Sequence, residues 1–193
     1  MMSSLSTVFA SPPLPSQSLA SVCFPDRAFL PSDPQNLWQI ENGLARTYTW
    51  DQHGSITTLG IWGKGDVVGQ SLSNVAPYVI QSLGTIKAHP LRHNLWQEPE
   101  AILSHTQQLT TLLKIISIKR ADDRLLSLLR WLAQRFGHVT PMGTCTTIPI
   151  THQELAEVAN LTRVTATRII GDMEQQGILK WSRRRQFILL ANP

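Results

Sequence analysis

A short stretch of the chain holds four side chains that could read DNA bases. They are Arg163, Val164, Thr167 and Arg168. An arginine can donate two hydrogen bonds to O6 and N7 of guanine, and a valine methyl group can pack on the methyl group of thymine. The apolar residues between them recur at the spacing of one buried helical face: Ala166, Ile169, Ile170 and Met173. The stretch therefore predicts a helix that buries one side and presents a DNA-reading surface on the other.

A second helix directly before this one would complete a DNA-binding arrangement. Thr151 and Glu154 have the spacing of a capping box, in which each side chain satisfies a free backbone N–H of the other residue. Asn160 suits a turn with a left-handed backbone, and Thr162 can cap the following helix. We expect residues 151–176 to form a helix-turn-helix, although similar helix pairs also occur in proteins that bind no DNA.

The residues after the helix pair predict a wing beside it. Residues 177–190 contain two short apolar runs around a basic turn, which is typical of a β-hairpin. The turn holds Arg183, Arg184 and Arg185, which we expect to bind DNA phosphates.

Charge is divided unevenly along the chain. Residues 1–113 carry a net charge of −2 and residues 114–193 carry +6, which together give the +4 of the 193-residue chain. The positive charge thus lies with the helix pair, as phosphate binding requires. A basic face that is merely solvated is the alternative. The length and this division favour two domains.

Cysteine usage and the beginning of the chain exclude several classes of protein. Cys23 and Cys145 are too few and too dispersed for a disulfide framework, a zinc site or an iron–sulfur cluster, which indicates the reducing cytoplasm. Residues 1–17 are rich in Ser and Pro and carry no charge, so they lack the basic region of a secretory signal and predict a disordered tail. No apolar run approaches the roughly 20 residues of a membrane span.

Residues 18–96 are expected to form a β-roll. Short apolar runs alternate there with turn signals at 31–34, Asn42-Gly43, His53-Gly54 and 64–66. Turn signals at strand-length intervals favour an all-β sandwich or roll. Four aromatic residues are expected to pack in its core and across its strands rather than to form a ligand cage: Trp38, Tyr48, Trp50 and Trp62.

Residues 97–120 predict a long helix. Its apolar residues have heptad-compatible spacing. They are Ile102, Leu109, either Leu112 or Leu113, and Ile116. A narrow seam of this kind suits a two-stranded coiled coil and hence a homodimer, whereas a surface helix packed on the roll is the alternative. Residues 122–137 predict a further amphipathic helix that packs on the helix-turn-helix and stops at Gly137.

This order of elements resembles the cyclic-AMP receptor and fumarate–nitrate-reductase regulators. The stretch LeuThrArgValThrAlaThrArgIleIleGlyAspMet at 161–173 is most similar to the global nitrogen-control branch. The run AspAspArgLeuLeuSerLeuLeu at 122–129 and ArgPheGly at 135–137 are similar to it as well. The resemblance is strong over 114–193 and moderate over 23–69.

The resemblance implies an α+β fold with four parts. These are a tail (1–17), a β-roll of the cupin-like jelly-roll type as sensor domain (18–96), a dimerisation helix (97–120) and a winged helix-turn-helix domain (121–193). It also implies double-stranded DNA, a second copy of the chain and RNA polymerase as partners. Residues that match Arg163, Val164 and Arg168 face bases in that family. With the wing, the expected phosphate contacts are Thr151, Gln153, Thr162, Thr165, Lys180, Arg183, Arg184 and Arg185.

The sensor half departs from the family pattern. A cyclic-nucleotide site has a Gly-Glu pair followed by an arginine that meets the cyclic phosphate, but here Gly69 precedes Gln70 and residues 70–86 hold no arginine. The nitrogen-control relatives bind a dicarboxylate with arginines in this loop and on the dimer helix, where this chain has His105. We therefore expect no cyclic-AMP site and no cofactor, and the small number of cysteines argues against an iron–sulfur cluster.

An enzyme is the contrasting class of function. The candidate groups are His53, His89, His93, His105 and Cys145. None of them has a carboxylate or a second ligand at motif spacing, so we expect no catalysis. A DNA-binding antagonist or architectural protein without a sensor, which shares operators with a related regulator, is the alternative to a regulator.

Overall fold

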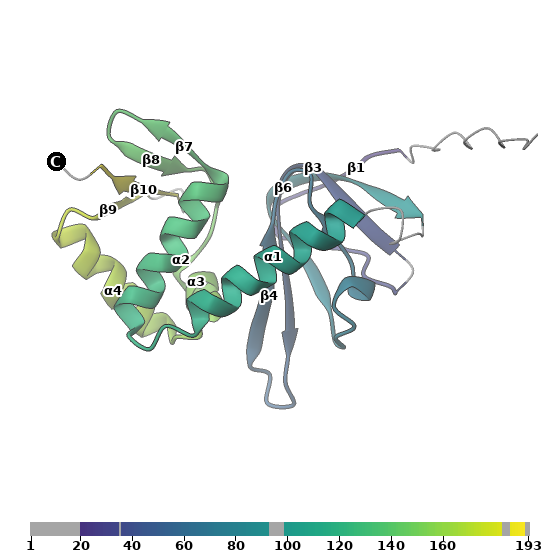
Figure 1. Cartoon of the computed structure of the whole chain (residues 1–193), viewed down its shortest axis with the longest axis horizontal. Helices are drawn as coiled ribbons and strands as arrows, with labels where there is room; N and C mark the ends of the chain where they lie inside the picture. The colour runs from purple at the N-terminus through teal and green to yellow at the C-terminus, as the bar shows by residue number, and fades with distance from the viewer. Residues whose placement is uncertain (1–19, 35, 93–98, 183–185, 192–193) are drawn as a thin grey trace, which may run out of the picture.

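The computed structural model describes residues 20–34, 36–92, 99–182 and 186–191. It has two lobes joined by a long helix (Figure 1). The N-terminal lobe, here called the roll, holds residues 20–92, and the C-terminal lobe, here called the helical lobe, holds residues 117–191. Helix α1, Pro99–Ile116, runs across the roll toward the helical lobe. The predicted tail at 1–17 lies outside the described residues.

The roll consists of β-strands, as the sequence predicted, and these strands form one antiparallel sheet. Its strand order is β1-β6-β3-β4, and β2 pairs with β6 while β5 pairs with β3. The elements are β1 (Val22–Phe24), β2 (Phe29–Leu30), β3 (Asn36–Trp50), β4 (Ile56–Trp62), β5 (Val67–Val68), the short 3₁₀ helix η1 (Gln70–Leu72) and β6 (Val79–Arg92). The hairpin of β3 and β4 projects beyond the rest of the roll in Figure 1.

One predicted turn is wrong. Strand β3 continues through Asn42 and Gly43, where its register with β6 shifts, so this pair forms an irregularity within a strand. Gly43 has a φ of 86°, and a Cβ atom there would lie 2.4 Å from the carbonyl oxygen of Thr85. The dipeptide that favours a hairpin turn serves here to let two long strands approach each other.

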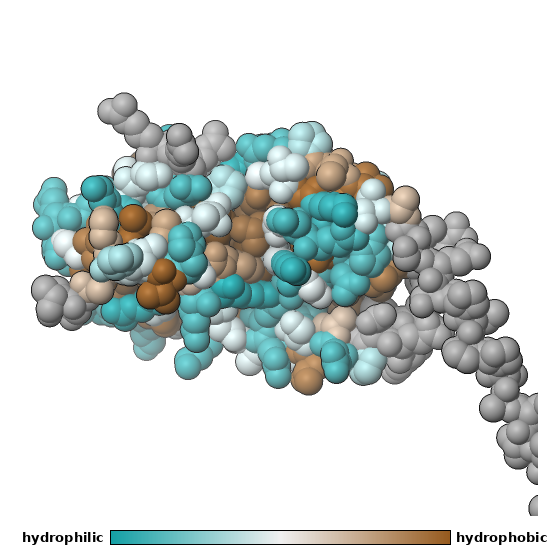
Figure 2. All heavy atoms as spheres, turned by 90° about the horizontal axis from the view of Figure 1, so that it is seen from above, coloured by the Kyte–Doolittle hydropathy of each residue, from teal (hydrophilic) through white to brown (hydrophobic). Residues whose placement is uncertain are grey.

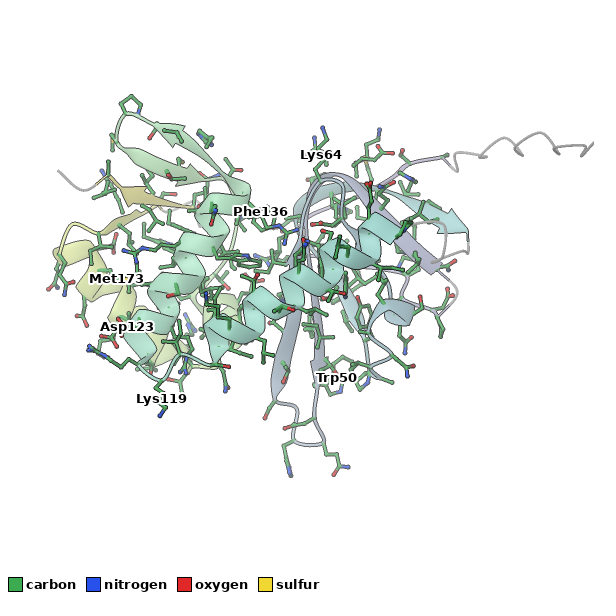
Figure 3. All side chains as sticks on the ribbon, in the orientation of Figure 1. Trp50, Lys64, Lys119, Asp123, Phe136 and Met173 are labelled. Atoms are coloured by element: carbon green, nitrogen blue, oxygen red, sulfur yellow. The ribbon has the colours of Figure 1, made fainter. Side chains whose placement is uncertain are left out.

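Aromatic side chains fill the roll. Trp38 and Trp62 are buried, and their indole N–H groups donate to the carbonyl oxygen of Pro31 and to Thr47 Oγ1, each at 2.8 Å. The prediction of core packing is confirmed for these two residues. Trp50 instead remains 42% exposed near the projecting end of the hairpin, where it pairs across the strands with Ile56 (Figure 3).

The helical lobe combines three helices with a small sheet. Its elements are α2 (Ala121–Phe136), β7 (Gly137–Thr140), β8 (Gly143–Thr146), α3 (His152–Val158), α4 (Arg163–Gln175), β9 (Leu179–Trp181) and β10 (Phe187–Leu190). The sheet order is β7-β8-β10-β9. Strands β9 and β10 are the predicted wing, whereas β7 and β8 were not expected. Helix α2 ends before Gly137 as predicted, but with φ −93° this glycine is extended; a Cβ atom there would lie 2.4 Å from Ala133 O.

The two lobes share an apolar core. Ile61 and Leu83 of the roll belong to the same buried cluster as residues of all four α-helices. Phe136, which lies at the junction of the lobes in Figure 3, packs against Gly63, where a Cβ atom would be only 2.6 Å from its ring. A second buried cluster lies within the roll alone.

Helix α1 has one face toward the protein and one face toward solvent. Leu112 is 6% exposed and belongs to the shared core, so its assignment to a dimer face is wrong. Leu109 and Leu113, by contrast, are 36% and 62% exposed, and Ile102 and Ile116 are half-buried. Exposed hydrophobic residues occur on both lobes, where Figure 2 shows them interspersed with hydrophilic ones.

Candidate nucleic-acid interface

The helix pair has the caps and the turn that the sequence predicted. Thr151 Oγ1 accepts from Glu154 N at 3.2 Å, and the Glu154 carboxylate accepts from Thr151 N at 2.8 Å, which completes the capping box. Asn160 has a φ of 52° in the turn. Thr162 Oγ1 then accepts from Thr165 N at 3.1 Å and starts α4.

Helix α4 buries the predicted face and exposes the predicted DNA-reading face. The buried residues are Ala166, Ile169, Ile170 and Met173. In Figure 3 Met173 lies beside the first turn of α2, marked there by Asp123. All four candidate base-reading residues are exposed, with Val164 at 79%: Arg163, Val164, Thr167 and Arg168. Helix α4 is thus anchored on one side and free to enter a groove on the other.

Two of these exposed side chains already have partners within the chain. Arg168 Nη1 donates to Asp172 Oδ2 at 2.8 Å, one turn further along α4. That contact uses one of the five guanidinium N–H groups and leaves others for a base. Thr167 Oγ1 lies 3.1 Å from His152 Nδ1.

The candidate phosphate contacts differ in how many of their donors are free. Thr151 gives both its backbone N–H and its hydroxyl to Glu154 Oε2, each at 2.8 Å, so a phosphate contact from Thr151 would have to displace one of these bonds. Gln153 is exposed and gives its amide to Glu157 Oε1 at 2.8 Å, which leaves a second amide hydrogen. Thr162 and Lys180 are exposed at the same lobe.

The remaining predicted phosphate contacts are of two kinds. Thr165 is half-buried, and its hydroxyl lies 2.9 Å from that of Thr162. Arg183, Arg184 and Arg185 lie outside the described residues.

The sequence did not predict a contact between His152 and Trp181. The two rings meet edge to face at 4.7 Å, and Trp181 in turn stacks on Phe187 at 5.7 Å, so the wing is fixed against the first turn of α3. Burial lowers the pKa of His152, and Arg163 adds to this effect while Glu174 opposes it. Two sequence features could have indicated this contact: a histidine directly after a helix-cap residue, and a tryptophan next to a basic turn.

The sensor position, defined here as the surroundings of His105, is filled by buried aromatic side chains of the roll and of α1. His105 of α1 stacks on Trp62 with ring centroids 4.3 Å apart, and Tyr78 is also buried. Burial raises the pKa of Tyr78 to about 12 and lowers the pKa of His105, the latter opposed by the nearby Asp66 carboxylate. Gln70, where the family pattern has a glutamate, donates to Val75 O at 3.2 Å. Among these residues Trp62, Tyr78 and His105 offer aromatic faces and no permanently charged group.

Two features are absent from the described residues. No helix among them is long and apolar enough to cross a membrane. Within the same residues no group of three or more His, Cys, Asp and Glu side chains could hold a metal ion.

Comparisons with known proteins agree with this geometry. Residues 123–193 match the family described as the Crp-like helix-turn-helix domain. The regulatory protein CysR of Synechococcus elongatus is 33% identical over 170 residues, which are 86% of this chain and 82% of that protein. The global nitrogen regulator of the same organism is 29% identical over 94 residues, 49% of this chain and 41% of that protein.

Solved structures share the fold over most of the chain. TTHB099, a transcriptional regulator of the CRP family from Thermus thermophilus, superposes with a TM-score of 0.76 at 16% identity and covers 88% of this chain and 92% of its own. FixK2 from Bradyrhizobium japonicum gives a TM-score of 0.71 at 15% identity and covers 88% and 91%. The similarity to CysR extends over most of both sequences, and the family match covers the helix-turn-helix. The chain therefore belongs to the Crp/Fnr family of transcriptional regulators, which carry a helix-turn-helix DNA-binding domain.

Proposed function

We propose that the chain regulates transcription as a homodimer that binds an inverted-repeat operator through one winged helix per subunit. The observation that carries the proposal is the exposed face of α4, where Arg163, Val164, Thr167 and Arg168 project from a helix whose opposite face is buried. Arginine and valine side chains on such a face can distinguish guanine and thymine in the major groove.

Helix α1 supplies the dimer contact. Leu109 and Leu113 lie one turn apart and are exposed. A two-fold dimer built on this face would place its recognition helices on half-sites about one helical turn apart.

Because Val164 stands where the cyclic-AMP branch has a glutamate, we expect half-sites that resemble GTA. RNA polymerase is the further partner that such a regulator needs.

The sensor position supports a regulator that does not respond to cyclic AMP. A desolvated phosphate or dicarboxylate needs a cation, and Trp62, Tyr78 and His105 provide none that is permanent. The effector is then uncharged or absent, and control passes to protein abundance or a partner. The same filling by Trp62 and His105 favours a second candidate function, an antagonist without a sensor that competes for the operators of a related regulator.

Binding-site selection from genomic DNA tests the proposal directly. Purified protein, with and without metabolite extract, should enrich an inverted repeat, and analytical ultracentrifugation should show a dimer. Half-sites of the form TGTGA would contradict the role of Val164.

Calorimetry with cyclic AMP and with 2-oxoglutarate tests the sensor. Saturable binding of either ligand with a tenfold gain in operator affinity, about 1.4 kcal/mol of coupling, would show that the loop has been misinterpreted.

A further inference from the structure

Two arginines of the roll reach across the lobe boundary to helix α3. Arg46 of β3 donates from Nη1 to Glu157 Oε2 at 2.5 Å, and Arg27, in the turn before β2, donates to Glu154 Oε1. Arg27 also donates from Nη2 to the carbonyl oxygen of Pro149 at 2.8 Å. Helix α3 is thus attached to the roll through both of its carboxylates.

Both ion pairs are largely shielded from water. The side chains of Arg46 and Glu157 are 5% and 13% exposed, and those of Arg27 and Glu154 are 26% and 10% exposed. The guanidinium of Arg46 also lies 4.6 Å from the centre of the Tyr48 ring, which restricts it further. Pairs at the surface are weak and mobile, whereas shielded pairs of this kind fix one geometry.

Arg27 adopts a backbone conformation that costs energy. Its φ is 64°, in the left-handed region that residues other than glycine rarely adopt. Such strain persists only where surrounding contacts hold it, and here the side chain contacts Glu154, Pro149 and Asp26. The strained turn therefore marks a contact that the fold maintains.

Each carboxylate connects its arginine to a candidate phosphate contact. Glu157 accepts from Arg46 with one oxygen and from the Gln153 amide with the other, at 2.8 Å. Glu154 accepts from Arg27 with one oxygen and from Thr151 with the other. The roll is therefore two hydrogen bonds away from the residues expected at the DNA backbone.

We propose that the roll is a structural part of the DNA-binding apparatus, in which Arg27 and Arg46 are positioning residues. They hold α3 by its carboxylates, and Arg46 orients the Gln153 amide toward the DNA backbone through Glu157. This inference rests on the proposed function. It assigns the roll a role in DNA affinity that needs no effector.

The test compares operator titrations of the full chain at several salt concentrations. Arg46→Met should weaken binding by roughly tenfold or more per subunit, the loss of one hydrogen bond from a neutral amide to an anionic phosphate. Because Gln153 is uncharged, the dependence of affinity on salt should keep its slope. Gln153→Ala should give the same loss, and the double variant should lose no more than either single one. Lys87→Met is the matched control, since Lys87 pairs with Glu41 at 2.8 Å within the roll and should leave affinity unchanged.

Two further variants guard against a folding defect. Arg46→Met/Glu157→Gln removes both charges, so it leaves no unpaired buried carboxylate, and it should show the same loss of affinity. Arg27→Gly/Glu154→Gln relieves the left-handed strain and removes both charges of the second pair, while Gln can still serve in the capping box, so it should fold and bind DNA more weakly. Wild-type affinity in the folded Arg46 variants, additive losses with Gln153→Ala, or a lowered salt slope would overturn the positioning role. A wild-type chain that selects no operator would instead overturn the proposed function.

Discussion

Thr162 offers a test that separates helix stability from DNA contact. Its hydroxyl caps α4 by accepting from Thr165 N, and it is exposed where a phosphate is expected. Thr162→Asp keeps a cap, because Asp is at least as good as Thr at this position. The first turn of α4 has no acidic residue, so the new charge also gains about 0.3 to 1 kcal/mol from the helix dipole. The free energy of unfolding should therefore stay equal or rise.

The same substitution should damage DNA binding. A carboxylate about 5 Å from a phosphate costs about 1 kcal/mol in a water-like medium and about 3 kcal/mol at an effective dielectric constant near 20. That range corresponds to roughly a 5- to 150-fold loss of affinity. Thr162→Ala should give the opposite profile, with about 1 kcal/mol lost in stability and a smaller loss in affinity.

Urea unfolding and fluorescence anisotropy on a selected operator measure the two effects. Thr162→Ser is the control, because it retains the hydroxyl and should resemble the wild type in both assays. If Thr162→Asp were stable and bound the operator as tightly as the wild type, no phosphate could lie near this cap. The proposed docking of α4 would then be incorrect.

Three further predictions concern the bases, the wing and the buried histidine. Replacing Arg163 or Arg168 by Ala should cost about 1 to 3 kcal/mol and relax specificity at one operator position, as measured by competition with single-base variants. Neutralising Arg183–Arg185 should lower the affinity for all DNA sequences alike, and it should reduce the slope of affinity against salt concentration by roughly one for each lost phosphate contact. An unchanged slope would show that these arginines contact solvent and not DNA. Burial lowers the pKa of His105 in the folded chain below the ordinary histidine value of 6.5. As pH falls through 6.5, the unfolded chain therefore binds a proton that the folded chain does not. The free energy of unfolding should decrease from there until the pH reaches the lower pKa of the folded chain. His105→Phe keeps the stack on Trp62 and should remove this component of the pH dependence in urea unfolding; an identical pH profile would contradict it.

Local signals allowed the helix-turn-helix to be predicted from the sequence. The caps at Thr151 and Thr162 and the left-handed Asn160 depend on residues within one turn of each other, and all three are as expected. Burial of the aliphatic face of α4 follows from the helical period alone. The residues on the exposed face of α4 could therefore be named from the sequence alone.

Contacts between distant residues could not be predicted. Gly43 was expected in a turn because its dipeptide is locally suited to one, and only the close approach of Thr85 gives it another use. Leu112 and Leu113 are equally apolar, and only the core shared by the two lobes distinguishes them, since Leu112 is buried in it. The Arg46–Glu157 pair joins residues 111 positions apart, for which no local pattern exists.

The shared core has a consequence for how the protein loses its structure. Because Ile61 and Leu83 complete a cluster that otherwise belongs to α1 and the helical lobe, the helical lobe cannot detach without exposing part of its own interior to water. Melting should consequently be cooperative across the lobe boundary, with one calorimetric peak whose enthalpy equals the van't Hoff value. Proteases that act on partly opened forms would find few such forms to cut, so turnover in the cell should follow global stability rather than local opening.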